Sequence, residues 1–358
     1  MRRVSGLIDR LVPESPQRSL TVPGADWLLE LRWSARIRRA PVLTPEQHAA
    51  MVADPGRRAA DIEVPIPCLL CGGTRLQPLF HPHDRKREVP RWDYHVVRCA
   101  DCGLLLRHPG IRPERLGDLY SGGRYSEFLA GKYTRKRKRR YKVTMAPFGR
   151  LFRRGRGRRL LDFGCGNGLF LDIAHKRGFD CYGVDLAADA IEVARQKPSG
   201  QNAYHGTPAE NPEIAAGGFD VITLWSVLAH LAKPVDDLTM LRNLLAPDGV
   251  LLVLTVNGAS IRLKHDLDTW GGFTANHLAI FNPDTLRLLL RRAGFGAVVM
   301  PPWYSEPVEL GKTRLSEREQ KHLRRVIDRG NRGNMLRAAA FVAPDGPERW
   351  GLDGVRLR

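Results

Sequence analysis

The sequence predicts an α/β protein with a doubly wound, mostly parallel, seven-stranded sheet, preceded by a small cysteine-rich module. Three observations support this fold class. From residue 159 onward, short apolar runs alternate with helical stretches, as in a parallel sheet covered by helices on both faces. Three glycines follow the first apolar run, where open α/β sheets bind their ligands. Two Cys-x-x-Cys pairs lie upstream of these glycines.

The expected elements follow the chain in order. Strands are predicted at 159–163, 181–185, 202–206, 219–226, 249–257, 295–300 and 338–343. Helices are predicted at 169–177, 188–196, 234–246 and 283–293, between these strands. Upstream, the stretch from Thr44 has Pro at its second position and Gln three residues after the Thr, which indicates a helix start.

The length of 358 residues suggests about two domains and an additional arm. The division we expect is a partly helical arm at 1–60, a metal module at 61–112, a basic helical linker at 113–158, the α/β domain at 159–345 and a tail at 346–358. No apolar run approaches the roughly 20 residues of a membrane span. We read no signal peptide, and we expect the cytoplasm as the compartment.

Charge is concentrated in one segment. The formal net charge is +19, and residues 132–159 alone carry 14 Lys or Arg and no acidic residue. The run from Arg135 to Arg140 is typical of a solvated face or an interaction arm, and less often of a nucleic-acid site. Aromatic residues do not interleave with this run, as they do on many surfaces that bind single-stranded nucleic acid.

The glycine turn has the spacing G-x-G-x-G, at Gly164, Gly166 and Gly168. A dinucleotide fingerprint would instead read G-x-G-x-x-G. Asp162 precedes the turn and would repel a pyrophosphate, but it can accept a hydrogen bond from an ammonium group. Asp185 ends the second predicted strand, where a carboxylate can bind both hydroxyls of a ribose. Adenosine with an amino-acid tail meets these demands.

The segments LLDFGCGNGLFL, GVD and FDVITLWSVLAHLAKPVDDLTMLRNLLAPDGVLLVLTVN together resemble class I S-adenosylmethionine-dependent methyltransferases. The resemblance covers roughly residues 160 to 300 and implies a Rossmann-like fold that binds S-adenosylmethionine. Many members have Glu-His where this chain has Ala229-His230. In place of the usual adenine-binding acid this chain offers Thr207 or its backbone. The remaining cofactor contacts that we expect are Leu186 and Trp225.

The four upstream cysteines predict a structural zinc site. Cys68, Cys71, Cys99 and Cys102 form two Cys-x-x-Cys pairs, and glycines follow each pair. Four thiolates complete the tetrahedral shell of Zn²⁺ and leave no position for substrate. Free buried thiols or a disulfide are the alternative. Cys165 and Cys181 are expected to be small apolar residues.

A zinc ribbon before a class I methyltransferase domain resembles two groups of proteins. One comprises bacterial methyltransferases that act on sugars, surface glycans or natural products. The other comprises ribosomal RNA guanine methyltransferases, whose ribbon uses three Cys and one His. Four cysteines favour the first group and therefore a small-molecule acceptor.

Methyl transfer to O or N needs alignment and often a base. His230, after the fourth predicted strand, and His277, in the long 258–282 segment, are the candidate catalytic residues, and a hydrogen-bonded structural role is the alternative for each. His265 is a third candidate. Tyr120 and Tyr125 could form a lid over the cofactor or pack the linker.

The function we predict is methyl transfer from S-adenosylmethionine to an O or N atom of a small molecule, with a sugar or a natural-product intermediate as the expected class. One alternative is an RNA methyltransferase that grips RNA with the ribbon and the basic run. Another is a non-catalytic module that binds the cofactor without transfer.

Overall fold

The structure is a computed structural model that describes residues 63–80, 94–112, 114–116, 134–153, 155–260, 263, 272–274, 276–302 and 317–352. Several sequence predictions lie outside the described residues. These are the arm at 1–60 with its helix at Thr44, the tyrosines Tyr120 and Tyr125, and His265.

A seven-stranded sheet forms the centre of the molecule, in the order β12-β13-β10-β9-β6-β7-β8. Its strands are β6 (Arg159–Phe163), β7 (Asp180–Asp185), β8 (Ala203–His205), β9 (Phe219–Trp225), β10 (Leu245–Val256), β12 (Ala297–Val299) and β13 (Met335–Phe341). Only β13 runs antiparallel to its neighbours among these strands. The predicted doubly wound, mostly parallel sheet is confirmed. The expectation for β10 was wrong at its start, because the strand begins at Leu245 and pairs there with Phe219 before a register shift.

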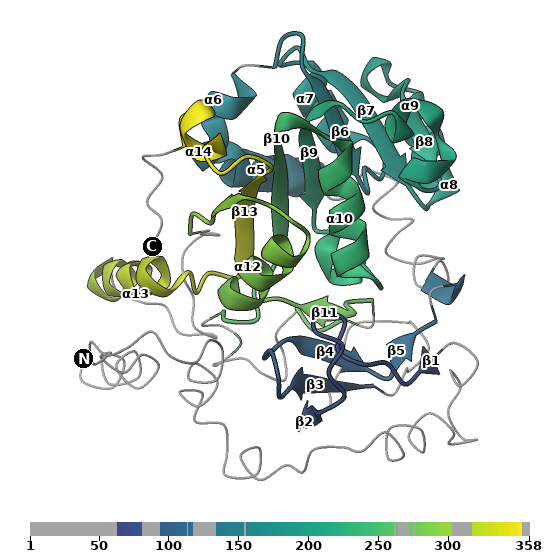
Figure 1. Ribbon diagram of the computed structural model, residues 1–358. Helices are drawn as coiled ribbons and strands as arrows, with labels where there is room; N and C mark the ends of the chain where they lie inside the picture. Colours follow the sequence, from purple (N-terminus) through teal and green to yellow (C-terminus); the bar gives the residue numbers. More distant parts are fainter. Residues whose placement is uncertain are drawn as a thin grey trace.

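Helices cover both faces of this sheet (Figure 1). One face packs against α7 (Leu169–His175) and α8 (Ala188–Arg195), whose buried side chains join those of β6 and β10 in one apolar cluster. The other face packs against α10 (Pro234–Leu244) and α12 (Pro283–Arg292). Shorter elements in the domain are η4 (Pro198–Gly200), η5 (Pro208–Glu210), α9 (Pro212–Ala215) and η6 (Leu228–His230).

The basic linker contains α5 (Thr134–Met145), η3 (Ala146–Phe148) and α6 (Gly149–Phe152). Tyr141 anchors α5 to the sheet, with its ring 5.2 Å from that of Phe170 and 6.2 Å from that of Trp225. We interpreted the run 135–140 as a solvated face or an interaction arm, and most of it is exposed. Four residues of the run are exposed, but Arg137 and Arg140 are half-buried because they share the helix face of Tyr141.

The cysteine-rich module builds a second, smaller sheet in the order β11-β4-β3-β2. Its own strands are β2 (Leu76–Phe80), β3 (His95–Cys99) and β4 (Leu105–His108), while β1 (Glu63–Val64) pairs with β5 (Gly110–Ile111). The fourth strand, β11 (Ala279–Ile280), belongs to the segment between β10 and α12. The module lies beside α10 and α12 in Figure 1. A strand from the segment between β10 and α12 therefore completes the small sheet of the module.

The apolar core continues from the module into the large domain. Leu70, Leu76 and Leu106 belong to the same buried cluster as Leu286 and Leu289 of α12. The described residues after β12 also include α13 (Glu317–Gly330), which we did not predict, and α14 (Gly346–Arg349). In the described part of the chain, none of the helices is long and apolar enough to cross a membrane.

Candidate active site

The glycine turn lies between β6 and α7, at the carboxyl edge of the sheet. Gly164, Gly166 and Gly168 have φ values of 76°, 54° and 70°, in the left-handed region that favours glycine. A Cβ at Gly164 would also lie 2.4 Å from Cγ2 of Val227. The turn therefore needs glycine for its conformation and for its close approach to the segment after β9. Gly168 precedes the first residue of α7, so the helix directs its N–H groups towards the turn.

Asp162, near the end of β6, is only 2% exposed. Its Oδ1 accepts a hydrogen bond of 2.6 Å from Thr223 Oγ1 on β9. Burial raises the pKa of Asp162 to about 7, against the lowering effect of the Thr223 hydroxyl. A buried carboxyl of this kind gains from a cationic ligand, because the ligand stabilises the ionised form.

Asp185 ends β7 and faces the same turn. Its Oδ2 accepts from Gly166 N at 2.8 Å, and its Oδ1 accepts from Ala187 N at 2.9 Å. Burial raises the pKa of Asp185, and these two backbone N–H groups oppose the rise. Each oxygen still has a lone pair for a ligand hydroxyl. The next residue, Leu186, has 58% of its surface exposed, whereas the other large apolar side chains of the described residues are at least partly buried. Such a side chain suits the face of an aromatic base.

Two buried polar atoms near this cleft have no hydrogen-bond partner among the described residues. One is Oδ1 of Asn167, within the glycine turn, and the other is Nε1 of Trp225, at the end of β9. Trp225 is 5% exposed and packs on Phe170, with ring centroids 5.0 Å apart. An unpaired buried donor or acceptor is costly, so both atoms fit a site that a polar ligand completes. Thr207 instead forms a capping box with Glu210, to whose carboxylate its hydroxyl donates at 2.9 Å.

The two candidate catalytic histidines come together. Their imidazole centroids are 4.8 Å apart. His230 Nδ1 lies 2.7 Å from the carbonyl of Asn276, and His277 Nδ1 lies 2.6 Å from that of Gly272. A carbonyl can only accept, so each Nδ1 carries the proton, and in the neutral imidazole Nε2 is then the acceptor. Both rings are thus held in the tautomer that a general base needs.

The cysteine module supports this histidine pair through β11, which begins two residues after His277. Ala279 and Ile280 pair with Leu106 and Leu105 of β4. Leu278 N donates to Ala229 O at 2.7 Å, which ties the two histidine segments together. Sequence reasoning did not identify this pairing, because two residues are too few to show a strand pattern.

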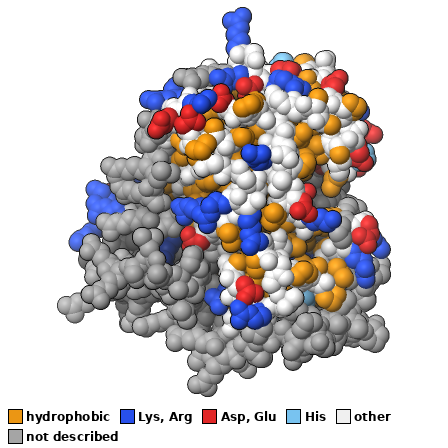
Figure 2. All heavy atoms as spheres, viewed as in Figure 1, with side chains coloured by type: hydrophobic (Ala, Val, Ile, Leu, Met, Phe, Trp, Pro, Cys, Tyr) orange, Lys and Arg blue, Asp and Glu red, His pale blue; other side chains and the backbone are white. Residues whose placement is uncertain are grey.

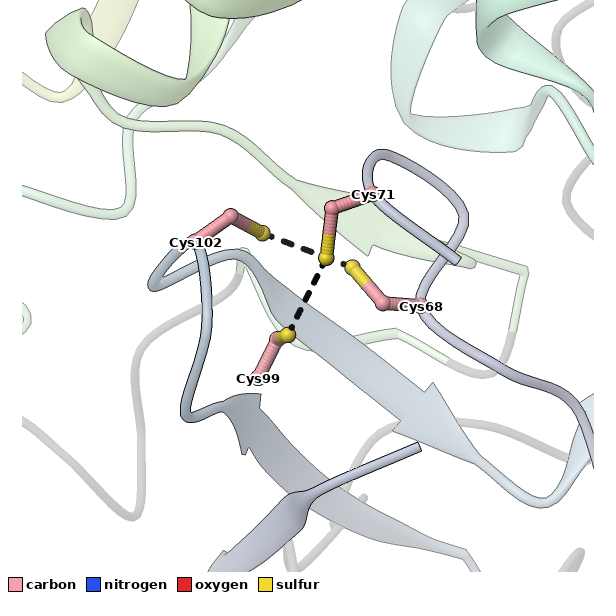
Figure 3. A group of neighbouring side chains, drawn as sticks. All are labelled: Cys68, Cys71, Cys99 and Cys102. Atoms are coloured by element: carbon pink, nitrogen blue, oxygen red, sulfur yellow. Dashed lines mark hydrogen bonds between the residues drawn. The ribbon is translucent and has the colours of Figure 1, made fainter. Parts of the chain in front are cut away.

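The four predicted metal ligands form one cluster (Figure 3). Their Sγ atoms all lie within 4.8 Å of one another, with 3.5 Å between Cys68 and Cys102 and 3.4 Å between Cys71 and Cys99. Tetrahedral zinc–thiolate bonds of about 2.3 Å place sulfurs about 3.8 Å apart. Gly72 and Gly103, with φ values of 74° and 79°, make the turns after each pair. The donors therefore fit Zn²⁺. Cys165 and Cys181 are each 6% exposed and lie in the other apolar cluster.

Sequence reasoning did not single out two buried residues that hold neighbouring segments together, and one of them, Thr223, contacts the site. Thr223 donates a hydrogen bond to Asp162. The strand pattern of β9 could have indicated it, because Thr223 and Trp225 are two residues apart and therefore point to the same side of the strand. Arg337, on β13, donates to the carbonyls of Val143 at 2.8 Å and Pro301 at 3.2 Å. No sequence signal distinguishes this buried arginine from the many exposed ones.

Comparison with known proteins agrees with this geometry. The family model described as "Methyltransferase domain" matches residues 133–299. The chain is 33% identical over 183 residues to a ubiquinone biosynthesis O-methyltransferase of Cereibacter sphaeroides, which covers 46% of this chain and 70% of that protein. This chain belongs to the S-adenosylmethionine-dependent methyltransferases.

Further relatives carry the same name. The Ruegeria protein is 30% identical, with 53% of this chain and 76% of that protein covered, and the Roseobacter denitrificans protein is 32% identical, with 43% and 66% covered. A crystal structure of a SAM-dependent methyltransferase from Archaeoglobus fulgidus aligns at 22% identity and a TM-score of 0.40, over 63% of this chain and 96% of that one. The matched family segment begins at residue 133 and leaves the cysteine module outside it.

Proposed function

We propose that the chain transfers a methyl group to an oxygen or nitrogen atom of a small molecule, with oxygen favoured. The observation that carries this proposal is the pair of neighbouring imidazoles in the segments that follow β9 and precede β11, each with Nδ1 bound to a carbonyl. A hydroxyl acceptor must lose its proton during transfer, and a neutral imidazole is a base that works near neutral pH. The relatives' printed name, ubiquinone biosynthesis O-methyltransferase, also favours oxygen.

The residues of the cleft fit S-adenosylmethionine. Asp162 would accept from the ammonium group, Asp185 would bind the ribose hydroxyls, and Leu186 would pack on the adenine. Gly164, Gly166 and Gly168 would let the backbone approach the ligand, and Trp225 and Thr207 would border it. When bound, the cofactor supplies the methyl group as an electrophile on sulfur.

His277 and His230 are the proposed catalytic residues. One imidazole Nε2 would accept the proton of the acceptor hydroxyl, while the carbonyl on Nδ1 keeps the ring oriented. Two neighbouring imidazoles disfavour simultaneous protonation, because like charges at this distance repel. The pair would therefore take up one additional proton during the reaction, beyond the proton that each Nδ1 already carries.

The cysteine cluster is proposed to bind one structural Zn²⁺ ion, and we keep the division into an arm, ribbon, linker, α/β domain and tail. Zinc would supply no chemistry to transfer, because four thiolates fill its shell. Unpaired cysteines suit a reducing compartment, and we propose the cytoplasm.

Transfer of label from methyl-labelled S-adenosylmethionine in a cell extract tests this function. We expect the label to appear in molecules that pass a small-pore filter, and His277→Gln to slow transfer by about 10²–10⁴-fold with unchanged S-adenosylhomocysteine affinity. Label in RNA would favour the RNA methyltransferase instead. Cofactor binding without any transferred label would favour the non-catalytic module.

A further inference from the structure

The segment 272–278, directly before β11, supplies both carbonyls that fix the histidine pair. His230 Nδ1 lies 2.7 Å from the carbonyl oxygen of Asn276, and His277 Nδ1 lies 2.6 Å from that of Gly272. His230 itself belongs to η6, on the other side of the contact. The tautomer of both imidazoles therefore depends on where this one segment lies, because the carbonyls determine which ring nitrogen carries the proton.

Strand β4 of the cysteine-rich ribbon holds the end of this segment by backbone hydrogen bonds. Arg107 N donates to Leu278 O at 3.0 Å, and Leu278 N donates to Ala229 O at 2.7 Å. Leu278 directly follows His277 in the chain. Ala229 directly precedes His230. A path of two backbone hydrogen bonds thus leads from β4 to the chain neighbours of both histidines.

The ribbon also holds the segment by apolar packing. Phe273 and Leu278 are 7% and 2% exposed and belong to one buried cluster with Val96 and Leu105 of the ribbon. A Cβ added to Gly258, the second residue after β10, would lie 3.4 Å from Cδ1 of Leu105. The Leu105 side chain therefore lies close to the point where the chain leaves β10 and shares a cluster with residues on both sides of His277.

The metal cluster lies directly before β4 in the chain. Cys99 N donates to Leu104 O at 2.9 Å, and Gly103 N donates to Cys99 O at 2.9 Å. The turn that carries Cys99 and Cys102 therefore closes onto the residue before the strand. All four residues of β4 are buried. Because metal binding and folding are coupled in such a small module, a metal ion bound to the turn also fixes the place of β4.

The residues of the cofactor cleft have their hydrogen-bond partners in the large domain. Asp162 accepts from Thr223 on β9, and Asp185 accepts from two backbone N–H groups at and after the glycine turn. These partners do not depend on β4 or β11. A displacement of the segment 272–278 should therefore change the histidine pair and leave the cofactor contacts in place.

We infer that the ribbon positions the proposed catalytic histidines, and that binding of zinc to its four cysteines thereby controls methyl transfer. This inference rests on the proposed function, because it takes the histidine pair as the base, and it adds the regulation of that site. When the cysteines hold the metal, β4 fixes the segment 272–278 and each Nδ1 keeps its proton. When they do not, the segment is released, the imidazoles lose their fixed tautomer, and the cofactor binds without transfer.

Leu105 is the positioning residue that tests this role with the metal in place. Leu105→Ala removes packing against the segment, and Leu76→Ala is the matched control. Both leucines are at most 1% exposed, but Leu76 lies on β2, the strand of the small sheet farthest from β11. Each variant is made in the full-length protein, and its zinc content is measured.

Nitrogen NMR of isotope-labelled histidine reports the tautomer, because a proton held on Nδ1 gives the two ring nitrogens distinct resonances, which an exchanging proton averages. We expect Leu105→Ala to lose the Nδ1–H signature of His230 and His277 and to bind S-adenosylhomocysteine with wild-type affinity. Label transfer in the cell extract should slow by about 10- to 100-fold, the cost of a misplaced catalytic group. Leu76→Ala should keep the signature and the rate of transfer.

Removal of the metal tests the control itself, and it decides the question if Leu105→Ala does not fold. A zinc chelator, applied well below the unfolding temperature, should abolish the Nδ1–H signature and label transfer while S-adenosylhomocysteine still binds. Added Zn²⁺ should restore both.

The inference is overturned if Leu105→Ala leaves the histidine resonances unchanged, if Leu76→Ala changes them as much, or if the metal-free chain keeps them. Loss of S-adenosylhomocysteine affinity together with the signature would also overturn it, because the ribbon would then support the whole fold rather than the histidines. If the signature depended on Leu105 but the wild type transferred no label, the proposed function would fail and the positioning would stand. Thermal unfolding shows whether each variant is folded.

Discussion

Asp162 connects cofactor binding to pH. Its buried carboxyl has a pKa of about 7, above the ordinary value of 3.8, so the unliganded folded state holds this proton between about pH 4 and 7 while the unfolded state does not. Stability from this group is therefore present at low pH and is lost as pH rises towards 7. A bound ammonium group reverses the preference, because it favours the carboxylate.

The first prediction concerns this coupling. S-adenosylhomocysteine should bind more tightly as pH rises from 6 to 8, by up to about tenfold per pH unit below 7, with release of a proton. Asp162→Asn should bind more weakly and lose the pH dependence. Calorimetry in buffers of different ionisation enthalpy measures the proton release. Asp180→Asn, an exposed carboxylate on the next strand, is the control, and a wild-type affinity independent of pH would contradict the assignment.

The second prediction concerns Asp185. Both of its carboxylate oxygens accept hydrogen bonds from backbone N–H groups. In Asp185→Asn, the side-chain NH₂ group would face one of these N–H donors and could not accept its hydrogen bond. We expect this change to weaken S-adenosylhomocysteine binding about tenfold or more, through the displaced turn and the lost ribose acceptor. Isothermal titration calorimetry measures the loss. Asp189→Asn, exposed on α8, should bind as the wild type does.

At the scale of elements, the strand and helix pattern from residue 159 onward could be predicted closely, because the central strands β6 and β9 and most of β10 are buried apolar runs. Helix α13 was missed although Ser316 and Glu319 have the spacing of a capping box directly before and within it. The start of β10 was misplaced because Asp248 and Gly249 look like a turn, yet the strand passes through them.

Only part of the candidate site could be predicted from the sequence. The glycines, Asp162, Asp185 and the cysteines stand in spacings that their chemistry requires. The contact between His230 and His277 and the burial of Arg140 depend on the crossing of distant segments, which leaves no local pattern. Two residues of the basic run, Arg137 and Arg140, are half-buried because α5 has an inner side that Tyr141 anchors to the sheet.

The third prediction tests the metal site with matched cysteines. Cys99 and Cys181 are both buried, but only Cys99 belongs to the four-sulfur cluster. The wild type should contain about one zinc ion per chain. Cys99→Ser should lose it and unfold at lower temperature, since metal binding contributes to folding, while Cys181→Ser should keep it. Elemental analysis measures the metal, and a wild type that purifies without zinc in zinc-supplemented medium would refute the site.

At the scale of the whole molecule, the apolar core of the ribbon continues into that of the large domain, so we expect the two to unfold as one unit. Cys68 and Cys99 lie in the same apolar cluster as the side chains of α12 and β10, and Arg292 of α12 donates to the carbonyl of Leu70. On the face shown in Figure 2, basic, acidic and apolar side chains are interspersed over the described residues. Among its described residues, this face therefore presents no continuous basic stripe of the kind that tracks a nucleic-acid backbone.

The fourth prediction follows from the shared core. Calorimetric unfolding should give one transition for the described ribbon and the large domain together, rather than two. A zinc chelator should lower the temperature of that single transition, and saturating S-adenosylhomocysteine should raise it by mass action. An early, separate transition that alone responds to the chelator would show that the ribbon unfolds independently.

Strand β11, which the large domain contributes to the sheet of the ribbon, also affects how the chain folds during synthesis. Ile280 pairs with Leu105 but follows it by 175 residues. At about 5–20 residues per second, the ribosome would need about 10–35 s to supply β11 after β4 has been made. During that interval the edge of β4 has no strand beside it, and unpaired edges invite contacts between nascent chains. The ribbon is therefore synthesised early, but its sheet is completed late.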